Sequence, residues 1–232
     1  MSKIKYYSGT VFNSGAKTLV NTVNCKGVMG AGIALEFKFR YPKMYEKYVL
    51  DCEASKYKTG EIYLFKDINE DILNFPTKDN WKYPSNIRWV SDGLDCFVKS
   101  YKSLNIKSIA FPKLGTSKGG LDWNVIKKLM EEKLSGLDDI EIIICLDDLT
   151  EAEGEEKRML DSLNVLSIEA LHELKNSKGK PFLKTEQVDI IYGKRPFSRF
   201  WKLQLLPKIG KKTYENMFLY FYKKNVVEQS LF

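Results

Sequence analysis

Hydrophobic and polar positions along residues 1–148 follow two alternating periods. Short apolar runs rich in β-branched and aromatic residues predict strands, and the amphipathic stretches between them predict helices. The expected strands cover 4–11, 18–24, 61–65, 72–75, 108–111 and 141–146, and the expected helices cover 31–53, 85–104 and 121–134. Pro42 is expected to divide the first helix, because proline disfavours helical geometry in the residue before it. The alternation of strands and helices predicts a layered α/β domain.

Two glycine-rich segments follow predicted strands. The segment 27–32 comes after a strand that ends in Asn24, and the segment 115–120 comes after the apolar run 108–111. Continuous apolar runs are typical of strands buried on both faces, and such sheets bind ligands beyond the carboxyl ends of their strands. Glycine allows backbone conformations that other residues resist, and the N-terminus of a following helix offers unpaired N–H groups to phosphate. The sequence therefore predicts a diphosphate held between two loops.

The pattern changes near residue 150. An acidic stretch at 147–156 precedes two aromatic and basic segments, 195–202 and 214–224. Residues 170–232 hold 13 lysines and arginines against 5 acidic residues, so the net charge of +7 arises in this part of the chain. We therefore predict a first domain over 1–150 and a small, basic, aromatic-rich α+β extension of unassigned role over 151–232.

The side chains of this extension suggest two roles. The aromatic ones are expected to build a small second core, and the basic ones are candidates for steering nucleic acid by neutralising phosphates. The aromatic set is Phe197, Phe200, Trp201, Tyr214, Phe218, Tyr220, Phe221 and Tyr222. The basic set is Lys194, Arg195, Arg199, Lys202, Lys208, Lys211 and Lys212.

Composition limits the remaining classes of function. Hydrophobic residues make up 44% of the chain, and no apolar run reaches the roughly 18 residues that a membrane helix needs. The first six residues lack the apolar segment of a secretory signal, so we expect a cytoplasmic protein without membrane contact. The single histidine, His172, and four cysteines without paired spacing predict no metal site, no disulfide framework and no histidine-based catalyst. The cysteines are Cys25, Cys52, Cys96 and Cys145.

A third marked segment reads Phe-Pro-Thr-Lys at 75–78, at the end of a predicted strand. Together with the asparagine-ended strand, the segment 27–32 and the Pro-Lys-Leu-Gly loop that ends in Gly-Gly-Leu-Asp-Trp at 119–123, it resembles the macrodomain family. Within that family the sequence is similar to the DarG-type antitoxin macrodomains, which remove ADP-ribose from thymine bases in DNA. The resemblance spans about residues 1–148 and implies a three-layer α/β/α fold with a mixed sheet flanked by helices.

The resemblance also implies roles for individual residues. Asn24 matches the asparagine that hydrogen-bonds the distal ribose, and Lys78 matches the lysine that DarG-like hydrolases need for catalysis, so both are expected to be catalytic. The glycine segments match the loops that wrap the diphosphate and the distal ribose through backbone N–H groups. The expected ADP-ribose-binding residues are Gly9, Thr10, Asn24, Gly27, Val28, Met29, Gly30, Ala31, Gly32, Thr77, Leu114, Gly115, Thr116, Ser117, Lys118, Gly119 and Gly120.

Two departures from the family pattern bear on specificity. Many macrodomains carry Gly-Asp after the first strand, where the aspartate binds the adenine amino group, but this chain has Gly9-Thr10. In the glutamate-directed relatives that share the lysine, an aspartate in the second loop completes the reaction, but Gly119 stands there. Asp122 lies three residues on and is expected to favour the start of a helix. A nucleic-acid substrate is therefore favoured over a protein glutamate.

The resemblance implies an enzyme, a DNA ADP-ribosyl glycohydrolase acting on ADP-ribosylated single-stranded DNA, with a DNA ADP-ribosyltransferase toxin as candidate partner. ADP-ribose is the expected ligand, and no cofactor or metal is expected. Two alternatives stay open: a module that binds ADP-ribose without cleaving it, and a hydrolase of small ADP-ribose derivatives or of ADP-ribosylated protein. A binding module would have no need of Lys78.

Several of these residues also have structural explanations. Asn24 can cap its own loop through the backbone, as asparagine often does. Lys78 can act as an amine that attacks the anomeric carbon or as a cation that donates a proton, and a lone lysine after a strand is often only a solvated surface residue. Trp81 and Trp123 are either core aromatics or rings that stack on a base at the mouth of the site.

Overall fold

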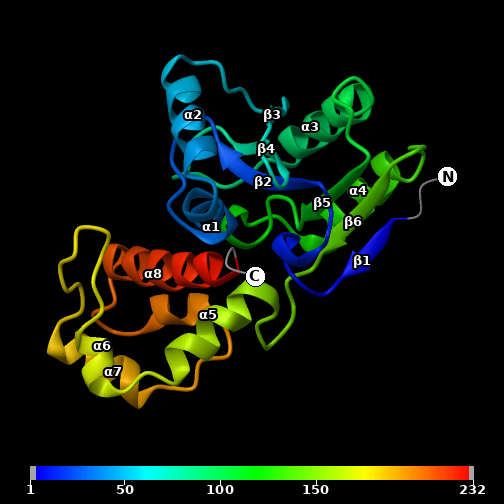
Figure 1. Ribbon diagram of the computed structural model, residues 1–232. Coiled ribbons are helices and arrows are strands. Elements are labelled where there is room, and N and C mark those ends of the chain that lie inside the picture. Colours follow the sequence, from blue (N-terminus) through cyan, green and yellow to red (C-terminus); the bar gives the residue numbers. More distant parts are fainter. Residues whose placement is uncertain (1–3, 230–232) are drawn as a thin grey trace. The chain divides into compact units, whose positions relative to one another are not determined.

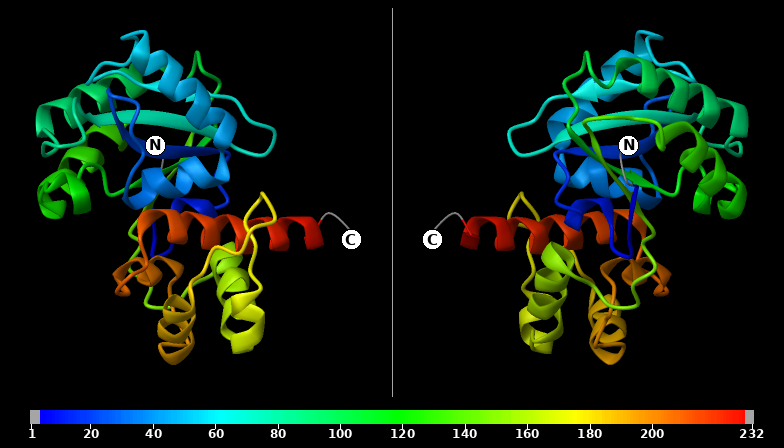
Figure 2. Two further views of the ribbon diagram at one scale, coloured as in Figure 1. Left: turned by 90° about the vertical axis from the view of Figure 1, so that its left-hand side faces the viewer. Right: turned by 90° about the vertical axis from the view of Figure 1, so that its right-hand side faces the viewer.

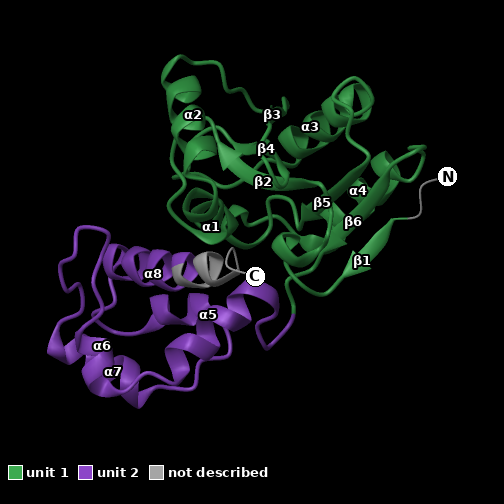
Figure 3. Cartoon of the chain, viewed as in Figure 1, with its two compact units in different colours: residues 1–148 green, residues 149–232 purple. Residues whose placement is uncertain are grey.

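The computed structural model describes residues 4–229, with side chains as far as residue 223. The chain divides into two compact units, which Figure 3 colours separately. Unit 1 is Met1–Asp148 and unit 2 is Leu149–Phe232. Among the described residues, no helix combines the length and the apolar character that crossing a bilayer requires.

Unit 1 is built on one six-stranded sheet with the order β1-β6-β5-β2-β4-β3. All neighbouring strands are parallel except β3, which runs antiparallel to β4 at one edge. The expected mixed sheet is therefore confirmed. The strands are β1 Lys5–Tyr7, β2 Thr18–Asn24, β3 Tyr63–Phe65, β4 Asp71–Lys78, β5 Ser108–Pro112 and β6 Glu141–Cys145.

Helices cover both faces of this sheet (Figures 1 and 2). They are α1 Gly32–Arg40, α2 Pro42–Glu53, α3 Ile87–Ser100 and α4 Trp123–Leu134. The strands sort their side chains with a period of two: in β5, Ile109 and Phe111 pack in the cluster that contains α3 and α4, and Ala110 packs in the cluster that contains α1 and α2. Two apolar clusters separated by the sheet make the three-layer arrangement that the sequence implied.

The first strand of unit 1 is shorter than predicted, and the first predicted helix is divided in two. The first strand was expected over 4–11, but β1 ends at Tyr7 and the chain turns into a short 3₁₀ helix, η1 (Val11–Asn13). As an edge strand, β1 pairs with the last residues of β6, and beyond Tyr7 the pairing becomes irregular, because the Ser8 and Gly9 carbonyls accept the N–H groups of Asp148 and Asp147. The first helix is divided as predicted, because Tyr41 leaves helical geometry and Pro42 begins α2.

Unit 2 is helical in its described part, so the expected α+β extension is wrong there. Its elements are α5 Gly154–Asn164, α6 Ile168–His172, α7 Thr185–Gly193, the 3₁₀ helix η3 Phe200–Leu205 and α8 Lys211–Gln229. Within the described residues of this unit, extended pairing is limited to an isolated bridge between Lys175 and Pro181. The aromatic residues of α8 follow helical spacing, since the rings of Tyr214, Phe218 and Phe221 all pack against Phe200.

Five of the eight aromatic side chains predicted for the core of unit 2 are buried there, where aliphatic side chains outnumber them. Phe200 lies at the centre, with its ring centroid 5.7 Å from that of Phe218 and 5.9 Å from that of Tyr214. Phe197 and Phe221 are also buried. Of the other predicted core aromatics, Tyr220 and Tyr222 are half-buried and Trp201 is 44% exposed.

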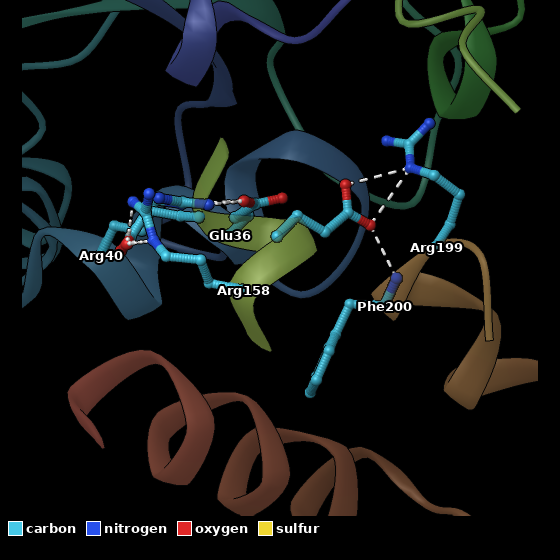
Figure 4. Close-up of polar contacts among 7 residues, drawn as sticks. Glu36, Arg40, Arg158, Arg199 and Phe200 are labelled. Carbon is cyan, nitrogen blue, oxygen red and sulfur yellow. Dashed lines mark hydrogen bonds and ion pairs between the residues drawn. The ribbon is translucent and has the colours of Figure 1, made fainter. Parts of the chain in front are cut away.

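Two of the arginines offered as nucleic-acid contacts serve the structure of unit 2. The buried Arg199 guanidinium meets the Glu156 carboxylate at 3.0 and 3.1 Å, and the same carboxylate accepts the Phe200 N–H (Figure 4). Arg195 donates to three backbone carbonyls at the end of α5, at 2.6 to 3.1 Å. Because a buried cation needs such partners, the structure argues against a phosphate-binding role for these two side chains.

Replacing Gly93 by alanine is expected to destabilise unit 1. A β-carbon on this residue of α3 would lie 2.5 Å from the ring of Phe75, which is fully buried. Helix propensity favours alanine by about 1 kcal/mol, but overpacking a filled core costs about 1–3 kcal/mol. The clash therefore outweighs the propensity, and the free energy of unfolding should fall. Gly193, also helical, has nothing within 4 Å of an added β-carbon and gives the matched control. Urea unfolding should show a lowered midpoint for Gly93→Ala alone; equal midpoints would contradict the packing.

Candidate functional site

Asn24 and Lys78 are neighbours at the carboxyl ends of two central strands. The register between β2 and β4 shifts at the end of β2, and the shift places Asn24 opposite Lys78. One residue further on, the Cys25 N–H donates to the Asp79 carbonyl at 2.9 Å, so the two chains stay paired as they leave the sheet. The two residues expected to be catalytic therefore lie side by side at the edge where ligands of such sheets bind.

The Asn24 side chain organises the first glycine loop. Its Nδ2 donates to the Val28 carbonyl at 2.6 Å, and its Oδ1 accepts the N–H groups of Lys26 at 2.9 Å and of Val28 at 3.4 Å. Gly27 sits inside this turn with φ of +75°, a conformation that favours glycine. The loop-capping role is thus present in the structure, and the contact between Asn24 and a ribose stays a prediction.

Buried polar groups fix this loop from below. The Tyr48 hydroxyl, on α2, donates to the Asn24 carbonyl at 2.7 Å, and Tyr48 is buried. Asn21 and Asn74, which are register partners, share a buried amide hydrogen bond of 2.9 Å. Sequence reasoning missed these residues, because a tyrosine at helical spacing or an asparagine within a strand carries no signal of its own.

The first loop ends at the amino end of α1. Ala31 is the N-cap residue and supplies no side-chain hydrogen bond, and the first turn of α1 contains no acidic residue. Gly32, with φ of +58°, starts the helix. The N–H groups of this turn and the helix dipole therefore favour an anion at this end.

The second glycine loop is a tight turn whose own hydrogen bonds fix its shape. The Gly120 N–H donates to the Thr116 carbonyl at 2.9 Å, and the Leu121 N–H donates to the Gly115 carbonyl at 3.1 Å. Gly115 and Gly120 have φ of +65° and +77°. Among the described residues, the N–H groups of Ser117 and Lys118 donate to no other group. They are candidate donors to a ligand.

Lys78 connects β4 to this second loop. Its Nζ donates to the Lys118 carbonyl at 2.7 Å, and burial of the side chain lowers the pKa of the ammonium group. A β-carbon added to Gly32 would lie 3.9 Å from Lys118 Cγ, so the two glycine loops approach each other at this point. The structure therefore brings together Lys78 and both predicted loops.

Ser85 packs against Gly119 of the second loop, the position at which the resemblance places an aspartate in the glutamate-directed relatives. The Ser85 N–H donates to the Gly119 carbonyl at 2.9 Å, and a β-carbon added to Gly119 would lie 2.4 Å from Ser85 Oγ. Ser85 is buried, and its hydroxyl has no hydrogen-bond partner in the described part of the chain. A side chain at position 119 would therefore have to displace Ser85. Asp122 caps α4 by accepting the Val125 N–H at 3.1 Å, so its carboxylate serves the helix as expected.

The other predicted binding residues lie around these loops with different degrees of exposure. Met29 and Leu114 are buried in the two apolar clusters, so only their backbones can meet a ligand. Thr77 is buried beside Lys78. Gly9 and Thr10 follow β1, which β6 and β5 separate from β2, and the Gly9 carbonyl accepts the Asp147 N–H at 3.2 Å. No contact in the structure assigns these two residues to adenine.

Other reactive groups near the loops offer no alternative chemistry. Burial raises the pKa of the Cys25 thiol to about 12, which keeps it protonated and poorly nucleophilic. Asp79 forms an ion pair of 3.1 Å with Lys26. Within the described residues, no group of three or more histidine, cysteine, aspartate or glutamate side chains is placed to hold a metal ion.

Comparisons with known proteins agree with this geometry. The family model described as "Macro domain" matches residues 20–130. The chain is 39% identical, over 145 residues, to the "DNA ADP-ribosyl glycohydrolase" of Mycobacterium tuberculosis, and the match covers 61% of this chain and 41% of that protein. The chain thus spans about two fifths of the length of this curated relative.

Solved structures give the same result. The "Macrodomain of Mycobacterium tuberculosis DarG" matches at 36% identity with a TM-score of 0.60, covering 63% of this chain and 99% of that one. The "Thermosipho africanus DarTG in complex with ADP-ribose" matches at 31% identity with a TM-score of 0.59, covering 67% of this chain and 44% of that one. By its fold, its loops and these relatives, the chain belongs to the macrodomain family.

Proposed function

We propose that unit 1 holds ADP-ribose between its two glycine loops and hydrolyses the bond between the terminal ribose and a DNA base. One observation carries this proposal: the Lys78 amine lies 2.7 Å from the carbonyl of Lys118 in the second loop, and Lys78 is the register partner of Asn24 at the start of the first. An amine is thereby fixed between two anion-binding loops, where the sugar next to a bound diphosphate would lie.

Binding rests on backbone groups. The first turn of α1 and the backbone N–H groups of Ser117 and Lys118 supply donors for a diphosphate. The Asn24 side-chain amide, which organises the first loop, would also hydrogen-bond the ribose, since an amide offers donors and an acceptor to a diol. The solved relative from Thermosipho africanus, whose structure contains ADP-ribose, supports this ligand.

The chemistry requires cleavage at the anomeric carbon through an oxocarbenium-like state, for which most glycosidases use two carboxylates. The two carboxylates nearest in sequence to the matched motifs have other partners: Asp79 forms an exposed ion pair with Lys26, and Asp122 caps α4. Lys78 remains. Because burial lowers its pKa, a larger fraction of the amine is neutral at a given pH than in free lysine, which favours attack by nitrogen on the anomeric carbon. The bond from the anomeric carbon to the base would break, and the base would leave with the proton that the amine gives up. Water would then displace the amine from the anomeric carbon, which releases ADP-ribose and restores the amine.

The second loop and the relatives support the proposed substrate class. Gly119, closed over by Ser85, leaves no room for the carboxylate that glutamate-directed relatives use, and the curated relative is named for ADP-ribosyl groups on DNA. ADP-ribosylated single-stranded DNA in the cytoplasm is the proposed substrate, and a DNA ADP-ribosyltransferase toxin is the proposed partner. Hydrolysis of small ADP-ribose derivatives is the alternative, and the assay with modified DNA separates the two.

Replacing Lys78 by alanine is expected to lower the release of ADP-ribose from ADP-ribosylated DNA at least 100-fold, because the reacting group is lost. Affinity for free ADP-ribose, measured by calorimetry, should change by less than about threefold. Lys107→Ala, on an exposed lysine before β5, is the matched control. Turnover by Lys78→Ala at the wild-type rate would refute the assignment, and a wild-type protein that binds ADP-ribose but never releases it from DNA would be a binding module.

The dependence of kcat/KM on pH distinguishes the two roles of Lys78. If the neutral amine attacks, kcat/KM should rise with pH and level off below the ordinary lysine pKa, because burial lowers the pKa of this group. If the ammonium donates a proton, kcat/KM should fall over the same range. Lys78→Arg stays protonated throughout and should be inactive in the first case. A profile that falls with rising pH would contradict attack by the amine.

Adding a methyl group at Gly119 is expected to weaken ADP-ribose binding at least tenfold, because the new β-carbon would meet Ser85 Oγ at 2.4 Å and displace the loop. Ser85→Gly in the same chain removes the clash and should restore most of the affinity. Gly136→Ala, which has nothing within 4 Å of its added β-carbon, is the control. Calorimetry with free ADP-ribose measures all four proteins, and full affinity in Gly119→Ala would exclude this loop from the site.

A further inference from the structure

The loop 79–86, which begins directly after Lys78 and leads into α3, exposes large apolar side chains. Trp81 is 50% exposed and Tyr83 is 65% exposed. Ile87, the first residue of α3, is 42% exposed. Of the two roles open for Trp81, the core role is therefore excluded. An exposed aromatic surface adjoins the proposed reactive amine.

Hydrogen bonds fix the shape of this loop. The N–H groups of Lys82 and Tyr83 donate to the side-chain and backbone oxygens of Asn80, at 3.0 and 3.1 Å. Ser85 ties the loop to Gly119 of the second glycine loop, and Asn86 caps α3 by accepting the Arg88 N–H at 2.9 Å. The rings are therefore presented on a preorganised support, which lowers the entropic cost of binding.

The charge around the rings is positive. The Lys82 ammonium lies 5.5 Å from the centroid of the Trp81 ring, and Lys82 is exposed. Arg88 contacts Asp92 only at 3.8 Å with 84% of its side chain exposed, so its charge remains available to a ligand. The acidic residue of the loop, Asp79, is paired with Lys26. Aromatic rings interleaved with exposed cations are typical of surfaces that bind single-stranded nucleic acid.

We propose that loop 79–86 is the strand-binding platform of this protein: Trp81 and Tyr83 stack on bases that flank the modified nucleotide, and Lys82 and Arg88 contact its phosphates. The inference rests on the proposed function and extends it from the ADP-ribosyl group to the strand that carries it. The occupant is a single strand and not a duplex, because only unpaired bases offer their faces to exposed rings. Because loop 79–86 begins directly after Lys78, a DNA strand bound to this platform would bring its modified base to the Lys78 amine.

Binding of an unmodified, fluorophore-labelled thymine-rich oligonucleotide tests the platform. Fluorescence anisotropy of the full chain should show affinity falling about tenfold for Trp81→Ala and again for Tyr83→Ala. Trp201→Ala, which removes an equally exposed tryptophan from unit 2, is the matched control and should bind as the wild type does. Lys82→Glu should reduce the slope of log affinity against log salt concentration by about 0.7, and Lys107→Glu should not.

Two further measurements separate this inference from the proposed function. Free ADP-ribose should bind the Trp81→Ala, Tyr83→Ala double variant with wild-type affinity in calorimetry, and KM for modified DNA should rise while kcat changes little. Wild-type affinity of the double variant for the oligonucleotide, no binding by the wild type, or a loss confined to Trp201→Ala would each overturn the platform. A wild-type protein that binds the oligonucleotide through Trp81 but releases no ADP-ribose from DNA would instead overturn the proposed function alone.

Discussion

The hydrogen bond from the Lys78 amine to the Lys118 carbonyl is the interaction on which the candidate site depends. It joins the end of a central strand to a loop that comes forty residues later, and it holds the amine in a partly buried place where its pKa is lowered. A lysine on an exposed strand end would keep its ordinary pKa and many rotamers. Here the Lys118 carbonyl fixes the direction of the Lys78 side chain, so that its amine lies beside the two glycine loops.

The sheet makes this contact possible. Parallel pairing of β2 with β4 brings Asn24 opposite Lys78 at the carboxyl ends of the strands. Buried polar groups then hold the first loop, with the Tyr48 hydroxyl on the Asn24 carbonyl and the amide pair of Asn21 and Asn74 beneath it. Such groups are costly to bury unless they are hydrogen-bonded, so they specify one arrangement of the loop above them. The site is therefore supported by groups that never touch a ligand.

Much of this arrangement follows from patterns in the sequence. Apolar periodicity predicted the layers, and glycine segments after strands predicted where the loops gather, because both patterns reflect backbone geometry and burial. The helical character of unit 2 was missed, since the aromatic residues of 214–224 fit either a strand or one face of a helix. The contact between Ser85 and Gly119 and the exposure of Trp81 depend on which loops meet in three dimensions, and no local pattern encodes that. Long-range contacts decide those features.

A crystal structure of the complex with ADP-ribose would test the central claim most directly. The account predicts the diphosphate on the N–H groups of Ser117 and Lys118 and on the first turn of α1, with the anomeric carbon about 3–3.5 Å from the Lys78 amine. The Lys78 amine should either have left the Lys118 carbonyl to contact the ribose, or lie between that carbonyl and the ribose. A diphosphate bound away from both glycine loops, or a Lys78 side chain turned into solvent with the ligand in place, would contradict it.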